Sequence, residues 1–121
     1  MEKNVCKSRS FKLWYFSISH RMALIRSPKD NIYANNIDIC FDAVEYIDCP
    51  IVLGNIEIEE ANLSDLEYVK TKVKSEIESS KVTVLVSEKN RFYIVSNTVK
   101  IVENKLDYME LPLCYIKPNF V

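Results

Sequence analysis

Residues 63–80, LSDLEYVKTKVKSEIESS, carry the clearest helical pattern in this 121-residue sequence. Ser64 and Glu67 have the spacing of a capping box, in which two side chains satisfy backbone amides at the start of a helix. An apolar stripe follows at spacings of three and four residues, made of Leu66, Val69, Val73 and Ile77. The pattern predicts one main helix near residues 64–80, with this stripe packed against a neighbouring element.

The segments on both sides of this helix alternate apolar and polar residues and are rich in β-branched and aromatic types, which is typical of strands. Four strands are expected before the helix and three after it, at residues 11–20, 22–26, 36–47, 56–59, 82–86, 92–102 and 106–111. The alternation of the third strand fails near Ala43 and Val44, which indicates a bulge. The predicted order is therefore ββββαβββ.

This order predicts an α+β fold with a mostly antiparallel, twisted sheet of about six to seven strands and one main helix. The loops are short, so residues 1–121 are expected to form a single domain, with residues 1–10 as a ragged lead-in. One helix of about sixteen residues cannot cover seven strands. The sheet must therefore curl, acquire a second layer, or leave an apolar face for a partner.

The composition disfavours most classes of enzyme. The sequence has one glycine and one histidine, which excludes glycine-rich phosphate loops and any metal site that needs two histidines. No cofactor, no metal site and no catalytic residue is expected. The chain lacks a run of about 18 apolar residues and a signal-peptide pattern at its start, so we expect no membrane span and a cytoplasmic location.

The four cysteines are far apart in the sequence, and none forms a CxxC pair that would suggest zinc or thioredoxin-like chemistry. Reduced thiols, some of them buried, are the simplest interpretation of Cys6, Cys40, Cys49 and Cys114. The competing interpretation pairs His20 with one of these cysteines as a nucleophile. No local pattern marks such a cysteine.

Charge is divided unevenly along the chain. Residues 1–29 have a net charge of +6, residues 30–69 have ten carboxylates and no lysine or arginine, and residues 70–121 have a net charge of +3. Two interpretations are open. In the first, basic strands pair with acidic ones and no patch remains. In the second, the acidic segment forms one exposed face that attracts a basic protein and repels nucleic acid and anionic lipid.

The second interpretation gives the candidate partner-binding residues, which are Asp38, Asp42, Glu45, Glu57, Glu59 and Glu60. On an alternating strand, Asp38 and Asp42 lie opposite Ile37, Ile39 and Phe41 and are expected to project into water. They stand about 13 Å apart along the strand, too far to bind one metal ion together. No spacing typical of a calcium loop is present.

The segments LWYFSISHRMALIRSP (13–28), NIDICFDAVEYIDCP (36–50) and RFYIVSNTVKIVEN (91–104) give the chain a resemblance in style to small single-domain bacterial proteins. Some proteins of that type are immunity factors for polymorphic or contact-dependent toxins. The resemblance implies a role as an immunity protein but assigns no residues.

The sequence therefore predicts a non-catalytic protein-binding module, most plausibly a cytoplasmic immunity protein or toxin inhibitor whose acidic surface meets a basic partner. The alternative is a small structural or ligand-binding domain, in which a curled sheet encloses an apolar pocket lined by Trp14, Phe16, Phe41 and Phe92. The partner's identity, the oligomeric state and the strand order do not follow from the sequence.

Overall fold

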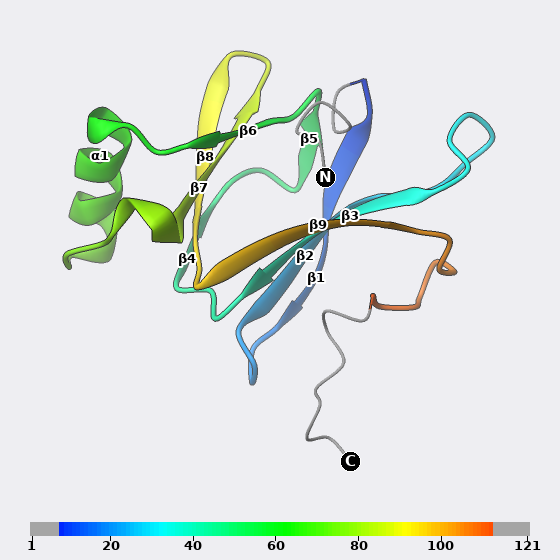
Figure 1. Ribbon diagram of the computed structural model, residues 1–121, viewed down its shortest axis with the longest axis horizontal. Helices are drawn as coiled ribbons and strands as arrows, with labels where there is room; N and C mark the ends of the chain where they lie inside the picture. Colours follow the sequence, from blue (N-terminus) through cyan, green and yellow to red (C-terminus); the bar gives the residue numbers. More distant parts are fainter. Residues whose placement is uncertain (1–7, 113–121) are drawn as a thin grey trace.

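The computed structural model of the protein describes residues 8–112. Over these residues the chain forms nine strands in two antiparallel sheets and one α-helix, which confirms the α+β class (Figure 1). The five-stranded sheet has the order β5 (Val52–Gly54), β1 (Ser10–Ser17), β2 (Met22–Ser27), β3 (Asn36–Asp42) and β9 (Thr98–Asn104). The four-stranded sheet has the order β4 (Tyr46–Asp48), β8 (Asn90–Val95), β7 (Val82–Ser87) and β6 (Glu57–Glu60). The helix α1 spans Leu63–Val73, and a 3₁₀ turn, η2, spans Ser79–Lys81.

The strand count exceeds the expected six to seven, partly because two predicted strands are each divided between the sheets. The predicted strand 36–47 becomes β3 and β4, and the predicted strand 92–102 becomes β8 and β9. The backbone turns at Ala43, whose φ is 51°. The amide of Asn97 donates to the carbonyl of Asp42 at 2.8 Å, so the two crossing points lie side by side. The predicted bulge near residue 43 is therefore wrong, because the chain changes sheets there.

One apolar core lies between the two sheets and accounts for the second layer that a single helix could not supply. Its buried residues come from both sheets and their connections: Phe11, Ala23, Ile25, Ile37, Ile39, Phe41, Val44, Leu53, Ile56, Leu85 and Ile94. Burial of each large apolar side chain contributes about 1.5–3 kcal/mol relative to exposure. The alternation predicted for β3 is confirmed, since Ile37, Ile39 and Phe41 all point into this core.

The helix is shorter than predicted and starts with a different cap. Asn62 is the N-cap, and its side chain and that of Asp65 form the capping box, in place of Ser64 and Glu67. The helix ends at Lys74, which adopts the left-handed conformation with φ of 59°. The predicted apolar stripe is confirmed on the helix at Leu66, Val69 and Val73, which pack against the four-stranded sheet. Ile77 packs against the same cluster but lies beyond the end of the helix. Figure 1 shows α1 on the side of β7 and β8, away from the five-stranded sheet.

Residues 105–112, which we call the strap, form no strand, although residues 106–111 were predicted to be one. The amide of Glu110 donates to the carbonyl of Asp107 at 2.9 Å and closes a turn.

The prediction that residues 1–10 form a ragged lead-in is wrong for the last residues of that segment, which the structure describes. Arg9 is buried and its guanidinium donates to the carbonyls of Ser27 and Asn35, while residues 1–7 lie outside the described part of the chain.

Candidate protein-binding site

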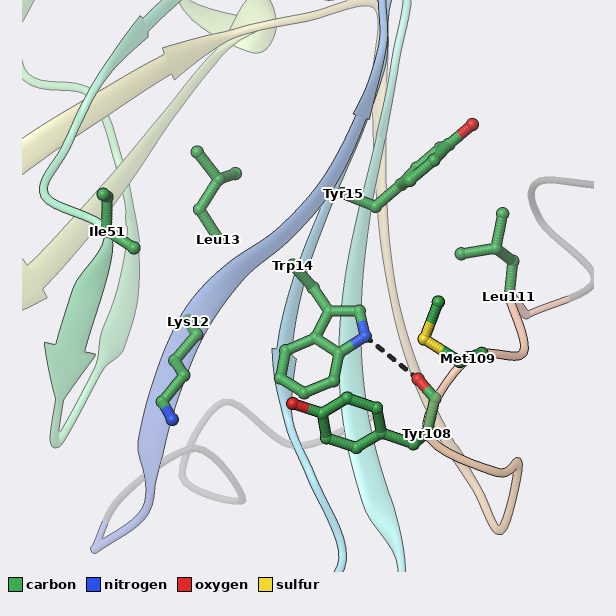
Figure 2. A pocket seen from close by; sticks show the side chains of 8 residues that line it. All are labelled: Lys12, Leu13, Trp14, Tyr15, Ile51, Tyr108, Met109 and Leu111. Atoms are coloured by element: carbon green, nitrogen blue, oxygen red, sulfur yellow. Dashed lines mark hydrogen bonds between the residues drawn. The ribbon is translucent and has the colours of Figure 1, made fainter.

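A surface pocket of about 280 Å³ lies where β1, the residue before β5 and the strap meet (Figure 2). Its lining is mostly apolar and consists of Lys12, Leu13, Trp14, Tyr15, Ile51, Tyr108, Met109 and Leu111. Four of these residues are consecutive on β1, and three come from the strap. The pocket therefore joins segments that are separated by more than ninety positions in the sequence.

The irregularity of β1 explains why two consecutive aromatic residues, Trp14 and Tyr15, line this pocket. The register of β1 against β2 shifts between Leu13 and Tyr15, so Trp14 is the extra residue of a bulge. Leu13 packs against the core between the sheets, whereas Trp14 packs on the opposite face of the five-stranded sheet, beside Leu24. Ordinary alternation already places Trp14 on the face opposite Leu13, and the bulge brings Tyr15, the cross-strand partner of Leu24, onto the same outer face.

The strap is attached to Trp14 through both its ring and its main chain. The indole Nε1 donates to the carbonyl of Tyr108 at 3.3 Å, and the two rings meet edge to face with centroids 4.8 Å apart. Figure 2 shows the Tyr108 ring beside the indole, and the hydrogen bond from the indole nitrogen to the main-chain carbonyl of Tyr108. Tyr108 and Met109 nevertheless remain 68% and 84% exposed. Ile51, on another side of the pocket, is 69% exposed.

Beneath this site lies a buried ion pair that the sequence analysis missed. Arg26 donates through Nε and Nη2 to the two carboxylate oxygens of Asp38 at 2.6 and 2.9 Å, and both side chains are fully buried. Asn104 donates to Asp38 Oδ2 at 2.8 Å. The prediction that Asp38 projects into water is therefore wrong. Arg26 and Asp38 are direct cross-strand partners, so the carboxylate is buried with its charge compensated.

The other candidate carboxylates do not gather on one strand or one edge. Asp42 ends β3 in the five-stranded sheet, and Glu45 precedes β4, at one edge of the four-stranded sheet. Glu57, Glu59 and Glu60 lie on β6, which is the opposite edge. Asp42, Glu45, Glu57 and Glu60 are exposed, but Glu59 accepts a hydrogen bond from Arg91 at 3.0 Å. Pairing with arginine therefore compensates the charge of two of the six candidate residues, Asp38 and Glu59.

A second polar network joins the start of α1 to the four-stranded sheet. Arg91 donates to both carboxylate oxygens of Asp65, at 2.9 and 2.6 Å, and Tyr93 donates to the same carboxylate at 2.8 Å. The Arg91 hydrogen bonds lower the pKa of Asp65 to about 2, against the opposing effect of burial, with further help from the Asn62 amide and Tyr93. These contacts position the helix and leave Asp65 ionised at neutral pH.

Asp48 organises two further tyrosines at the edge of the same sheet. Its Oδ2 accepts hydrogen bonds from Tyr46 at 3.2 Å and from Tyr68 at 2.9 Å. Burial and the charge of Asp48 raise the pKa of Tyr46 to about 12, and the hydrogen bond to Asp48 raises the pKa of Tyr68. Both phenols therefore keep their protons and act as hydrogen-bond donors.

The cysteines depart from the expectation of four reduced thiols. Cys40 is disulfide-bonded, and Cys49 has a free thiol. Burial and the nearby Asp48 charge raise the pKa of Cys49 to about 11, which makes it a poor nucleophile at neutral pH. Cys6 and Cys114 lie outside the described residues.

The pocket expected inside a curled sheet is not the pocket that the structure shows. Phe41 is buried in the core between the sheets, and Phe92 packs against it, while Trp14 lies on the outer face. A second surface pocket, of about 410 Å³, lies between β6, the η2 turn and Val99.

Within residues 8–112, no cluster of three or more metal-ligating side chains occurs. No helix in the same residues is long and apolar enough to cross a membrane.

No protein-family model, curated protein or solved structure matches the chain.

Proposed function

We propose that this protein is a non-catalytic protein-binding module and that its partner binds at the pocket of Trp14. The observation that carries the proposal is the exposure of Tyr108, Met109 and Ile51 around a pocket that contains an aromatic side chain. Soluble proteins rarely leave such residues together in water unless they contact another molecule. Aromatic residues and methionine are also the types enriched in protein interfaces.

The dimensions of the pocket support a protein side chain as its occupant. At about 280 Å³ the pocket lies at the lower end of the usual range of about 300–1,000 Å³ for ligand sites, a volume that suits a single side chain. An aromatic or aliphatic side chain from a partner would fill it and be shielded from water by the surrounding residues. Such anchors at the centre of an interface supply most of its affinity.

The narrower proposal is an immunity protein or toxin inhibitor that meets a basic partner. Its support is the resemblance noted above and the four exposed carboxylates Asp42, Glu45, Glu57 and Glu60, which would attract a basic surface over long range. A cytoplasmic location is part of that proposal. The disulfide of Cys40 argues against it, because disulfides persist mainly in oxidising compartments.

The test uses the full chain as immobilised bait in three forms, with an extract of the cells that produce the protein. Ile51→Asp places a charge in the wall of the pocket, and Leu63→Asp places the same charge on α1. Leu63 is the matched control because it is 81% exposed, compared with 69% for Ile51. Both substitutions should leave the melting temperature nearly unchanged.

The proposal predicts at least one protein that is retained by the wild type and by Leu63→Asp but lost from Ile51→Asp. A partner retained equally by all three baits would contradict the assignment of the pocket. If a small molecule co-purifies with the wild type and Ile51→Asp loses it, the ligand-binding alternative is favoured.

A further inference from the structure

Cys40 lies on the outer face of the five-stranded sheet, is 5% exposed and forms a disulfide bond. The other cysteine within residues 8–112, Cys49, has a free thiol and is therefore not its partner. If the bond is internal to the chain, the second sulfur belongs to Cys6 or Cys114, which precede and follow the described residues. The contacts at the two ends of the described chain distinguish these candidates.

The N-terminal end of the described chain is held far from Cys40. The amide of Ser8 donates to Asn55 Oδ1 at 2.7 Å, just beyond the end of β5. Cys40 lies in the same row of the sheet as Leu24 and Tyr15, since Leu24 is the cross-strand partner of both. Ser8 comes seven residues before Tyr15, and β1 is two strands away from β3. At about 3.4 Å per residue and 4.8 Å per strand, the Cα atoms of Ser8 and Cys40 are roughly 20 Å apart.

Cys6 is too close in sequence to Ser8 to bridge this distance. Two residues of fully extended chain span at most about 7 Å. Even a chain that ran straight back from Ser8 would leave Cys6 roughly 13 Å from Cys40, whereas the Cα atoms of a disulfide lie about 4.4–6.8 Å apart. Within one chain, Cys6 is therefore excluded as the partner.

The C-terminal end of the described chain lies against Cys40. Leu111 packs against the cluster that contains Cys40, and Pro112, the next residue, is buried. Cys114 follows Leu111 by three residues, which span up to about 11 Å. That length allows Cys114 to approach Cys40 to the separation that a disulfide requires.

From these two ends of the chain we infer that Cys114 is the disulfide partner of Cys40 and that the bond fastens the strap to the five-stranded sheet. When the bond forms, the two thiols give up two protons and two electrons to a low-molecular-weight disulfide such as oxidised glutathione, which leaves as two thiols. The strap contributes Tyr108 and Met109 to the Trp14 pocket, so the bond holds one wall of that pocket in place. Because the bond is internal to the chain, it forms whether or not a partner binds at the pocket.

Peptide mapping of the full chain, refolded in a mixture of oxidised and reduced glutathione, identifies the bonded pair. Free thiols are alkylated in denaturant without prior reduction. Trypsin then releases three cysteine-containing peptides: residues 4–7 with Cys6, residues 30–70 with Cys40 and Cys49, and residues 106–121 with Cys114. We expect the second peptide to be linked to the third, and the first to be recovered alkylated.

A second digestion shows which cysteine of residues 30–70 carries the bond. Chymotrypsin cleaves after Phe41 and Tyr46 and so separates Cys40 from Cys49. A link from Cys40 to residues 4–7, a link from Cys49 to residues 106–121, or an alkylated Cys40 would overturn the assignment. The wild type alone decides this result, so no variant has to fold.

Two serine variants test whether the bond stabilises the fold. Cys114→Ser opens a loop whose ends are 74 positions apart, so without reductant it should melt at least about 5 °C below the wild type. Cys6→Ser is the matched control and should melt with the wild type. A thiol reductant should lower the melting temperature of the wild type to that of Cys114→Ser and leave that of Cys114→Ser unchanged. Equal melting temperatures of the two variants without reductant would contradict a stabilising bond at Cys114.

The fluorescence of Trp14, the only tryptophan, reports on the strap because its indole contacts Tyr108. A strap freed at its end opens more often and covers the indole less. Acrylamide should therefore quench Trp14 about twofold more strongly in Cys114→Ser than in Cys6→Ser. Equal quenching would overturn the fastening of the strap, even where the peptide map links Cys40 to Cys114.

Discussion

Arg26 and Asp38 place opposite charges under the strap with no exposure to water, and each satisfies the other. Removing one partner of such a pair leaves an uncompensated buried charge, which costs about 3–5 kcal/mol. Asp38→Ala should therefore lower the free energy of unfolding by that amount in urea denaturation. Asp42→Ala removes an exposed carboxylate from the same strand and should change it by less than about 0.5 kcal/mol. Equal losses would show that the pair is not what stabilises this face.

Asp65 gives the protein a stabilising interaction that depends on pH. Its pKa is lowered from 3.8 to about 2 in the folded state, chiefly by Arg91. A lowered folded-state pKa stabilises the fold above the unfolded value and loses this effect as the pH falls through the folded value. Between pH 5 and pH 2 the wild type should lose about 2 kcal/mol more stability than Asp65→Asn. Parallel pH profiles of the two proteins, measured by urea unfolding, would contradict this assignment.

The residue-scale features were only partly accessible to sequence reasoning. Alternation correctly placed Asp38 and Ile39 on opposite faces of their strand, but the prediction also assumed that one of these faces is exposed to solvent. The solvent exposure of a sheet face depends on which other segments pack on it. Here the strap covers Arg26, and the covering residues are more than eighty positions away. No local pattern carries that information.

At the scale of elements, α1 is a brace on the outer face of the four-stranded sheet. Val69 is fully buried there, whereas Lys72 lies on the exposed side of the helix. Val69→Ala should lower the free energy of unfolding by about 1–3 kcal/mol because it removes buried methyl groups and leaves a cavity. Lys72→Ala should change it by less than about 0.5 kcal/mol. Thermal or urea unfolding of the two variants checks the register, and equal effects would contradict it.

The first and last residues of the helix and strands were predicted less accurately than the existence of these elements. Asn62 and Asp65 form the capping box in place of Ser64 and Glu67, and Arg91 and Tyr93 hold the Asp65 carboxylate through contacts that no local spacing shows. The predicted strand at residues 82–86 is confirmed as β7. The long predicted strands failed at Ala43 and near Asn97, where the chain crosses from one sheet to the other. Strand-forming residues continue on both sides of each crossing, and the break in alternation at Ala43 was interpreted as a bulge within one strand.

At the scale of the whole molecule, a single helix and a surplus of strands left three possibilities: a curled sheet, a second layer, or an apolar face for a partner. The structure has the second layer, in the form of a second sheet, with the helix outside that sheet and the strap outside the other. The binding site could not be predicted in this way. The pocket exists because the outer-facing residues of β1 meet the strap, and this contact joins distant parts of the chain.

If the Trp14 pocket supplies the lasting affinity for a partner and the acidic segment only speeds association, changes in the two regions will affect different rate constants. The most direct test is the binding kinetics of a captured partner with two full-length variants. Ile51→Asp should raise the dissociation rate at least tenfold. Joint neutralisation of Asp42, Glu45 and Glu60 to Asn, Gln and Gln should only slow association and flatten its salt dependence. A partner whose dissociation rate rises tenfold in the neutralised variant and stays unchanged in Ile51→Asp would contradict the claim.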